Sequence, residues 1–156
     1  MMNEEIISET EKYNRCVDDI GKLLQKNVRI LQMFEREQIK VHGFTSSQCY
    51  LLLTIFRNGP LTINEISCRM KLDISTITRI MDNLVRDGLI IRQRLQTDKR
   101  TVEAVLTDAG KLEAEKLQTG ITNYYRNVIS HLPRGRVREV MSSMELLLDA
   151  LERSNG

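Results

Sequence analysis

The sequence contains no tryptophan, only two prolines and few aromatic residues, which make up 4% of the chain. A β-sandwich or β-barrel would carry more aromatic residues in its strands and more proline in its turns. Charged residues, by contrast, account for 28% of the chain. This composition predicts a mainly α-helical protein, and a length of 156 residues is sufficient for one domain with a hydrophobic core.

Cysteines and long apolar runs are scarce as well. The three cysteines, Cys16, Cys49 and Cys68, are odd in number and show no C-x-x-C spacing, which argues against a disulfide framework and against a zinc site. No apolar run is long enough to span a membrane, and the acidic amino-terminal segment does not resemble a signal peptide. We therefore expect a cytoplasmic protein without a membrane partner, a metal or a cofactor.

The net charge is only +2, so overall basicity does not indicate a nucleic-acid partner. The charges are unevenly placed, however. The first twenty residues are acidic, whereas residues 86–100 carry more cations than anions. The cations in this stretch are Arg86, Arg92, Arg94, Lys99 and Arg100, against Asp87 and Asp98. A local concentration of positive charge is typical of a surface that contacts phosphate groups.

The first half of the chain has the pattern of four helices. Apolar residues at three- and four-residue steps predict a first helix over residues 9–41, which Gly43 ends. The helix-terminating sequence Asn58-Gly59-Pro60 ends the second helix, and Gly88 ends the fourth. Residues able to cap a helix precede the second, third and fourth helices: Thr45 with Gln48, Thr62 with Glu65, and Asp73.

After the fourth helix the period of the apolar residues changes from about 3.6 to about 2, which indicates β-strands. Residues 89–95 and 101–106 form the two strands, and Asp98 is suited to cap the polar turn between them. Thr107 then caps a long helix, and a break around Pro133 precedes a last helix. Two short, closely joined helices followed by a β-hairpin describe a winged helix-turn-helix.

The fourth helix has the composition of a DNA-recognition helix. Its apolar residues recur on one face, which leaves hydroxyl, amide and guanidinium groups on the other. Such groups bind phosphates and base edges, and arginine can contact guanine with two hydrogen bonds. The alternative for this face, and for the hairpin, is an ordinary solvated surface. Candidate DNA contacts are Ser75, Thr76, Thr78, Arg79, Asn83 and Arg86 on the helix and Arg92, Arg94, Lys99 and Arg100 on the hairpin, with Asp98 orienting the hairpin turn.

Residues 98–110, DKRTVEAVLTDAG, resemble the D-x-R, L-T-x-x-G signature of the MarR (multiple antibiotic resistance regulator) family. Segments upstream agree with the family in order and spacing: FTSSQ at 44–48, GPLTINEI at 59–66, and the recognition helix with the first wing strand at 75–92. The resemblance is close over residues 45–110 and extends to the outer helices by layout only. Lys99 departs from the arginine of many members, although a phosphate contact tolerates this change.

The resemblance implies a winged-helix homodimer of mainly α, α+β class. One domain would span residues 1–156, with a DNA-binding lobe over 45–110 and dimerisation helices over 9–41 and 111–154. The two recognition helices would enter successive major grooves of a pseudo-palindromic operator in double-stranded DNA, and Arg100 would reach the minor groove. The function implied is transcriptional repression that a small anionic or phenolic effector relieves.

The alternatives to this function are a thiol-based redox sensor, a winged-helix module that binds protein, and an enzyme. A thiol-based redox sensor would need a reactive cysteine, and Cys16 has the cation Arg15 beside it but also Asp18 and Asp19. A winged-helix module that binds protein instead of DNA would lack salt-dependent DNA binding. The sequence has no catalytic triad, paired carboxylates or phosphate-binding loop, so we do not expect an enzyme.

Two remaining residue types have simpler interpretations. Cys49 and Cys68 lie in amphipathic helices and are expected to be small core residues. The only histidines, His42 and His131, are far apart in sequence, so a metal site would have to combine His42 with carboxylates of the first helix. We expect no such site.

Overall fold

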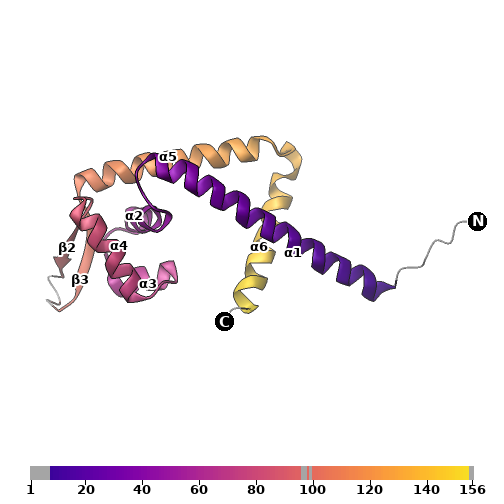
Figure 1. Ribbon diagram of the computed structural model, residues 1–156, viewed down its shortest axis with the longest axis horizontal. Helices are drawn as coiled ribbons and strands as arrows, with labels where there is room; N and C mark the ends of the chain where they lie inside the picture. Colours follow the sequence, from indigo (N-terminus) through magenta and orange to yellow (C-terminus); the bar gives the residue numbers. More distant parts are fainter. Residues whose placement is uncertain (1–7, 96–97, 99, 155–156) are drawn as a thin grey trace, which may run out of the picture.

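Figure 1 shows short helices and a β-hairpin gathered at one end of the molecule, from which longer helices extend. The computed structural model describes residues 8–95, 98 and 100–154; Lys99, a candidate DNA contact, lies outside these ranges. The elements are α1 (Glu9–Phe34), a π-helical turn (Glu35–Ile39), α2 (Ser46–Asn58), β1 (Leu61–Thr62), α3 (Ile63–Met70), α4 (Ile74–Arg86), β2 (Ile90–Arg94), β3 (Val102–Leu106), α5 (Asp108–Ser130), a 3-10 turn (Arg134–Arg136) and α6 (Val137–Ser154).

The helices begin where the sequence predicted. Thr45 and Thr62 each form a complete capping box, in which the threonine side chain accepts from the third helical N–H and the third side chain accepts from the threonine N–H. Asp73 caps α4 by accepting from the Thr76 N–H at 2.8 Å, and Thr107 caps α5 by accepting from the Gly110 N–H at 3.0 Å. Each cap satisfies backbone donors that the first helical turn leaves without a partner.

The sheet has one strand more than the sequence predicted. The predicted hairpin is present as β2 and β3, paired antiparallel with Arg92 opposite Ala104. β1 pairs with the other edge of β3, with Leu61 opposite Ala104, so the strand order is β1-β3-β2. β1 ties the segment before α3 to the base of the hairpin, so the sheet joins the helix-turn-helix to the wing.

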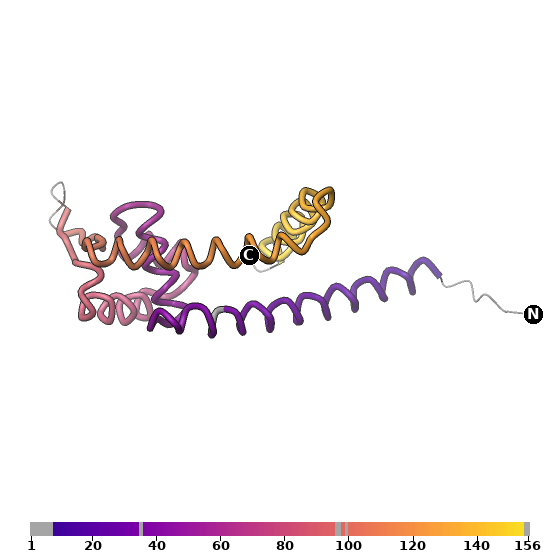
Figure 2. Tube along the Cα trace, turned by 90° about the horizontal axis from the view of Figure 1, so that it is seen from above, coloured from indigo at the N-terminus to yellow at the C-terminus, as the bar shows by residue number. Residues whose placement is uncertain are grey.

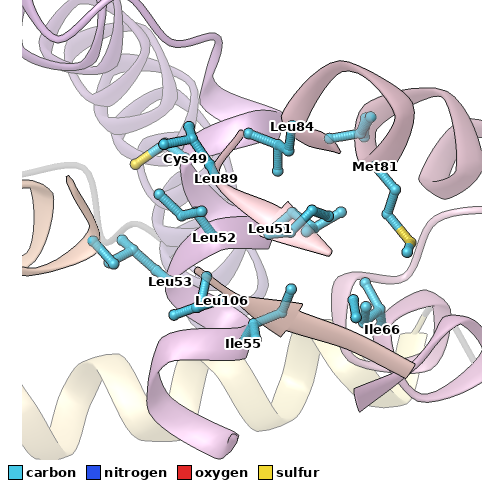
Figure 3. Close-up of a cluster of buried hydrophobic side chains, with 14 of the residues drawn as sticks. Cys49, Leu51, Leu52, Leu53, Ile55, Ile66, Met81, Leu84, Leu89 and Leu106 are labelled. Atoms are coloured by element: carbon cyan, nitrogen blue, oxygen red, sulfur yellow. The ribbon is translucent and has the colours of Figure 1, made fainter. Parts of the chain in front are cut away.

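The hydrophobic core is built around α2. Figure 3 shows its apolar side chains between those of α3, α4 and the sheet. Leu51, Leu52 and Ile55 of α2 are at most 2% exposed, as are Ile66 of α3 and Leu84 of α4. This core fixes α4 by its buried face and leaves the opposite face in solvent.

Helix α5 begins in tight contact with the start of β2. A Cβ atom at Gly110 would lie 1.9 Å from the carbonyl oxygen of Leu89. The Thr107 hydroxyl reaches the same segment, since it donates to the carbonyl oxygen of Gly88 at 2.7 Å. Only glycine allows the helix and the strand to approach this closely.

Helices α1 and α5 extend away from this lobe, and α6 turns back from the far end of α5 (Figures 1 and 2), so that Glu152 lies 3.6 Å from Lys71 of the lobe. Phe34 is the one buried residue of α1 in the part of the chain that the structure describes, and α6 has none. Large apolar side chains of both helices are exposed, among them Ile20 at 48% and Leu148 at 55%. No helix within the described ranges is long and apolar enough to cross a membrane.

Two details differ from the sequence predictions. The first helix covers the predicted range, but residues 35–39 form a π-helical turn near its end. Cys49 is buried as expected, whereas the prediction of a buried Cys68 was wrong, because this cysteine is exposed. Ile66 is the buried residue of α3. Cys68 lies two positions further along, about 200° around the helix axis, and therefore faces outward.

Candidate nucleic-acid interface

Helix α4 presents a polar face to solvent because most of its apolar residues turn inward, with Ile74 at its start the exposed exception. Its buried residues are Ile77, Ile80, Met81 and Leu84. On the opposite side lie the candidate contacts predicted from the sequence: Ser75, Arg79 and Arg86 are exposed, and Thr76, Thr78 and Asn83 are half-buried at the margins. The structure therefore brings all six onto one accessible surface, next to the hairpin.

The hydroxyl groups on this surface are already engaged as donors. The Ser75 hydroxyl donates to Asp73 Oδ1, and the Thr76 hydroxyl donates to Asp73 Oδ2 at 2.7 Å. The Thr78 hydroxyl donates to the carbonyl oxygen of Ile74, also at 2.7 Å. Asp73 thus holds both hydroxyls that follow it in addition to capping the helix.

These hydrogen bonds lower the pKa of Asp73 well below its ordinary value. The largest contribution comes from the Ser75 hydroxyl, followed by the Thr76 hydroxyl and the Thr76 N–H. Each stabilises the ionised carboxylate. Asp73 is therefore an anion at neutral pH, placed where the partial positive charge of the α4 N-terminus also favours an anion.

The cap at Asp73 leads to a prediction about pH. A carboxylate whose pKa is lower in the folded chain than in the unfolded chain stabilises the fold above its ordinary pKa, here 3.8, and loses this effect as pH falls through the folded value. The urea midpoint of the wild type should therefore exceed that of Asp73→Ala at about pH 7, and the difference should shrink towards about pH 3. A difference that stays constant over this range would contradict the assignment.

The arginines of the two elements fall into two groups. The guanidinium groups of Arg79 and Arg94 have no hydrogen-bond or ion-pair partner among the described residues. Arg86 pairs with the neighbouring Asp87 at 3.3 Å, with both side chains largely exposed. Exposed pairs of this kind contribute little to stability and give way readily to a phosphate.

Arg92 differs from the other predicted contacts, because it links the wing to the recognition helix. Its Nη2 donates to Asp82 Oδ1 of α4 at 2.5 Å. The two side chains are 40% and 56% exposed. Sequence reasoning placed Arg92 among free cations and did not single out Asp82. The nine residues of helix, turn and strand between them hid the pairing, which depends on how β2 folds back along α4.

The wing turn is organised by Asp98. Its Oδ1 accepts from the Arg100 backbone N–H at 2.9 Å, and its Oδ2 accepts from the Thr101 hydroxyl at 2.8 Å. These bonds, that of Arg100 first, lower the pKa of Asp98. Asp98 thus holds the Arg100 backbone and leaves the guanidinium without an ion-pair partner among the residues described.

Comparisons with known proteins agree with this geometry. A family model for the MarR family matches residues 44–102. The transcriptional repressor MdtR of Bacillus subtilis is 29% identical over 107 residues, which cover 69% of each chain. The regulator YsmB of the same organism is 29% identical over 119 residues, covering 76% of this chain and 82% of its own.

Solved structures are similar over nearly the whole chain. Reduced AbfR bound to DNA has a TM-score of 0.65 at 27% identity, covering 91% of this chain and 98% of AbfR, a protein of Staphylococcus epidermidis. A MarR transcriptional regulator of Methanosarcina mazei has a TM-score of 0.73 at 24% identity, covering 87% and 98%. These likenesses confirm the predicted winged-helix fold.

Proposed function

Because this chain belongs to the MarR family, we propose that it is a homodimeric, sequence-specific DNA-binding transcriptional regulator that acts as a repressor. The observation that carries the proposal is the set of free guanidinium groups on the recognition helix and wing of a lobe similar to that of DNA-bound AbfR. Arg79 is suited to the major groove, and Arg100 to the negative potential of a narrow minor groove.

The dimer is supported by the uncovered outer helices. An isolated helix in water is marginally stable, and most helical stability in proteins comes from burying one apolar face. α1 has 26 residues and α6 has 18, yet both expose their apolar stripes in a single chain. A second copy of the chain covers both stripes at once, and its two-fold symmetry matches a pseudo-palindromic operator.

The effector that relieves repression is proposed to be a small anionic or phenolic compound. One relative of this chain is the homoprotocatechuate degradative operon repressor of Escherichia coli, 23% identical over 123 residues. An effector acts only through different affinities for the DNA-bound and free conformations. Titration of the protein–DNA complex with phenolic acids tests this part, and unchanged DNA affinity throughout would contradict it.

Thiol-based redox sensing is a second candidate. The similar protein AbfR has been solved in reduced, overoxidised and disulfide forms, and in this chain Cys16 and Cys68 are exposed. Peroxide would then release DNA from the wild type but not from the variant that lacks the sensing thiol. If peroxide releases DNA from Cys16→Ser and from Cys68→Ser as readily as from the wild type, both thiols are excluded as the sensor.

The proposed function is tested by the salt dependence of DNA binding. Arginine contacts with phosphates release counterions, so the logarithm of the affinity should fall linearly and steeply with the logarithm of the salt concentration. A winged-helix module that binds protein instead would show no such dependence and no preference among DNA sequences. Fluorescence anisotropy with labelled duplexes measures both the salt dependence of the affinity and the preference among DNA sequences.

Arg100→Ala is expected to weaken operator binding by about 1–3 kcal/mol without loss of the folded dimer. The Asp98 bonds to the turn involve the backbone of residue 100 and the Thr101 side chain, so the turn survives the substitution. Arg138→Ala removes the same charge from an exposed position on α6 and serves as the control. Equal affinities for these two variants would remove the wing from the mechanism.

A further inference from the structure

The surface that α4 offers to DNA contains one large apolar side chain among polar ones. Ile74, the first residue of the helix, is 51% exposed and does not belong to the core cluster. A single exposed isoleucine is ordinary on a protein surface. Its position is what makes it informative, because the first residues of a recognition helix are those that approach the base edges in the major groove.

The neighbouring hydroxyls restrict what this surface can bind. A hydroxyl has one proton to donate and two lone pairs that accept. The protons of Ser75, Thr76 and Thr78 are all donated within the chain. Their oxygens can therefore only accept further hydrogen bonds, and they cannot donate to a phosphate while these bonds persist.

Ser75 is the hydroxyl best placed to meet a base. It lies about 170° around the helix axis from the centre of the buried face, at 100° per residue, whereas Thr76 and Thr78 lie at its margins. Ile74 is the adjacent residue in the chain. It points about 100° around the axis from Ser75, so an apolar side chain and a hydrogen-bond acceptor occupy the first two positions of α4, and both are exposed.

We propose that this part of α4 reads an A·T base pair in the major groove, with Ile74 against the thymine C5-methyl group and the Ser75 oxygen accepting from the adenine N6 amino group. The inference rests on the proposed function and names the base pair that the recognition helix selects. In the major groove only an A·T pair presents both a methyl group and an amino group.

A G·C base pair fits this surface less well than an A·T pair. Guanine presents two acceptors in the major groove, and these would face a serine oxygen that has no free proton. Cytosine offers an amino group but no methyl group for Ile74. Asp73 is a positioning residue in this arrangement, because its carboxylate keeps the hydroxyl protons of Ser75 and Thr76 turned away from the groove.

The experiment uses the whole chain and DNA duplexes in which one functional group of a single base is removed at a time. Selection from a duplex library with a randomised core first gives the preferred half-site. Each thymine is then replaced by uracil, which removes the methyl group, and each adenine by purine, which removes the amino group. At one A·T pair per half-site, replacing thymine by uracil should weaken binding about fourfold. Replacing the adenine of that pair by purine should weaken binding about threefold to tenfold.

Two variants assign these effects to residues. Ile74→Ala should bind the thymine and uracil duplexes equally, and Ser75→Ala should no longer distinguish adenine from purine. Leu112→Ala is the matched control, because Leu112 is exposed to a similar degree, 53%, but lies on α5. This variant should still bind thymine duplexes more tightly than uracil duplexes, and adenine duplexes more tightly than purine duplexes.

The outcomes separate the two proposals. If selection enriches no sequence, the proposed function itself is contradicted. If a half-site is enriched but its A·T pairs tolerate both base changes, or if Ile74→Ala still prefers thymine to uracil, this inference is overturned while the regulator function stands. The base changes use the unaltered protein, so they remain decisive even where a variant fails to fold.

Discussion

Gly110→Ala is expected to destabilise the DNA-binding lobe by at least about 3 kcal/mol and to leave little folded protein. The new methyl group would lie 1.9 Å from the Leu89 carbonyl oxygen and 2.9 Å from its carbonyl carbon. Both atoms belong to the backbone, so no side chain can rotate away. Either α5 or the start of β2 must move, and both are anchored by Thr107.

The same substitution ten residues further along α5 provides a matched control. A Cβ at Gly120 would meet the His42 side chain at 3.8 Å, an ordinary contact. Alanine in a helix interior is more favourable than glycine, so Gly120→Ala should stabilise the protein by about 0.5–1 kcal/mol. Urea unfolding measures both variants. A Gly110→Ala protein as stable as Gly120→Ala would contradict the close approach of α5 and β2.

Truncation after Leu132 is expected to yield a monomer or an aggregate and to lower operator affinity by about 10²–10⁴-fold. The deletion removes α6, which has no buried residue in the described chain, so the core of the lobe keeps its contacts. It takes away one of the two apolar stripes that the second copy is proposed to cover. Light scattering after size exclusion measures the mass, and anisotropy measures the affinity.

A single substitution separates loss of the dimer from loss of the helix. Leu148→Lys places a charge on the exposed apolar stripe of α6 and leaves the helix itself intact. It should give a soluble, folded monomer with weak DNA binding, whereas a change at the polar Asp149 should leave the dimer unaffected. A soluble dimer from either the truncated chain or Leu148→Lys would refute the role of α6.

The local structure of this chain was largely predictable because its signals are short in range. The starts of α2, α3, α4 and α5 each depend on a hydrogen bond between residues three positions apart, as in Thr62 with Glu65, and such pairs can be read from the sequence. β1 escaped prediction because it consists of Leu61 and Thr62 alone. Its partner strand is β3, some forty residues away, so no local sequence pattern indicates it.

The candidate site was predicted as a set of residues but not as a set of bonds. The polar face of α4 follows from the helical period, and the structure brings the predicted residues together there. The pairing of Arg92 with Asp82 and the capture of two hydroxyls by Asp73 depend on tertiary geometry and on proton direction. The outward Ile74 has no signal in composition, since an isoleucine is expected inside.

The ion pair between Asp82 and Arg92 has a consequence for operator length. Together with the sheet, it links the recognition helix to the wing of the same lobe. One base pair inserted between half-sites would shift the second half-site by about 3.4 Å and turn it by about 34°. A wing linked to its helix in this way follows the position of that helix on its own half-site. The displacement of the second half-site must therefore be taken up by α1, α5 and α6. The stiffness of these helices sets which spacings between half-sites the protein can bind.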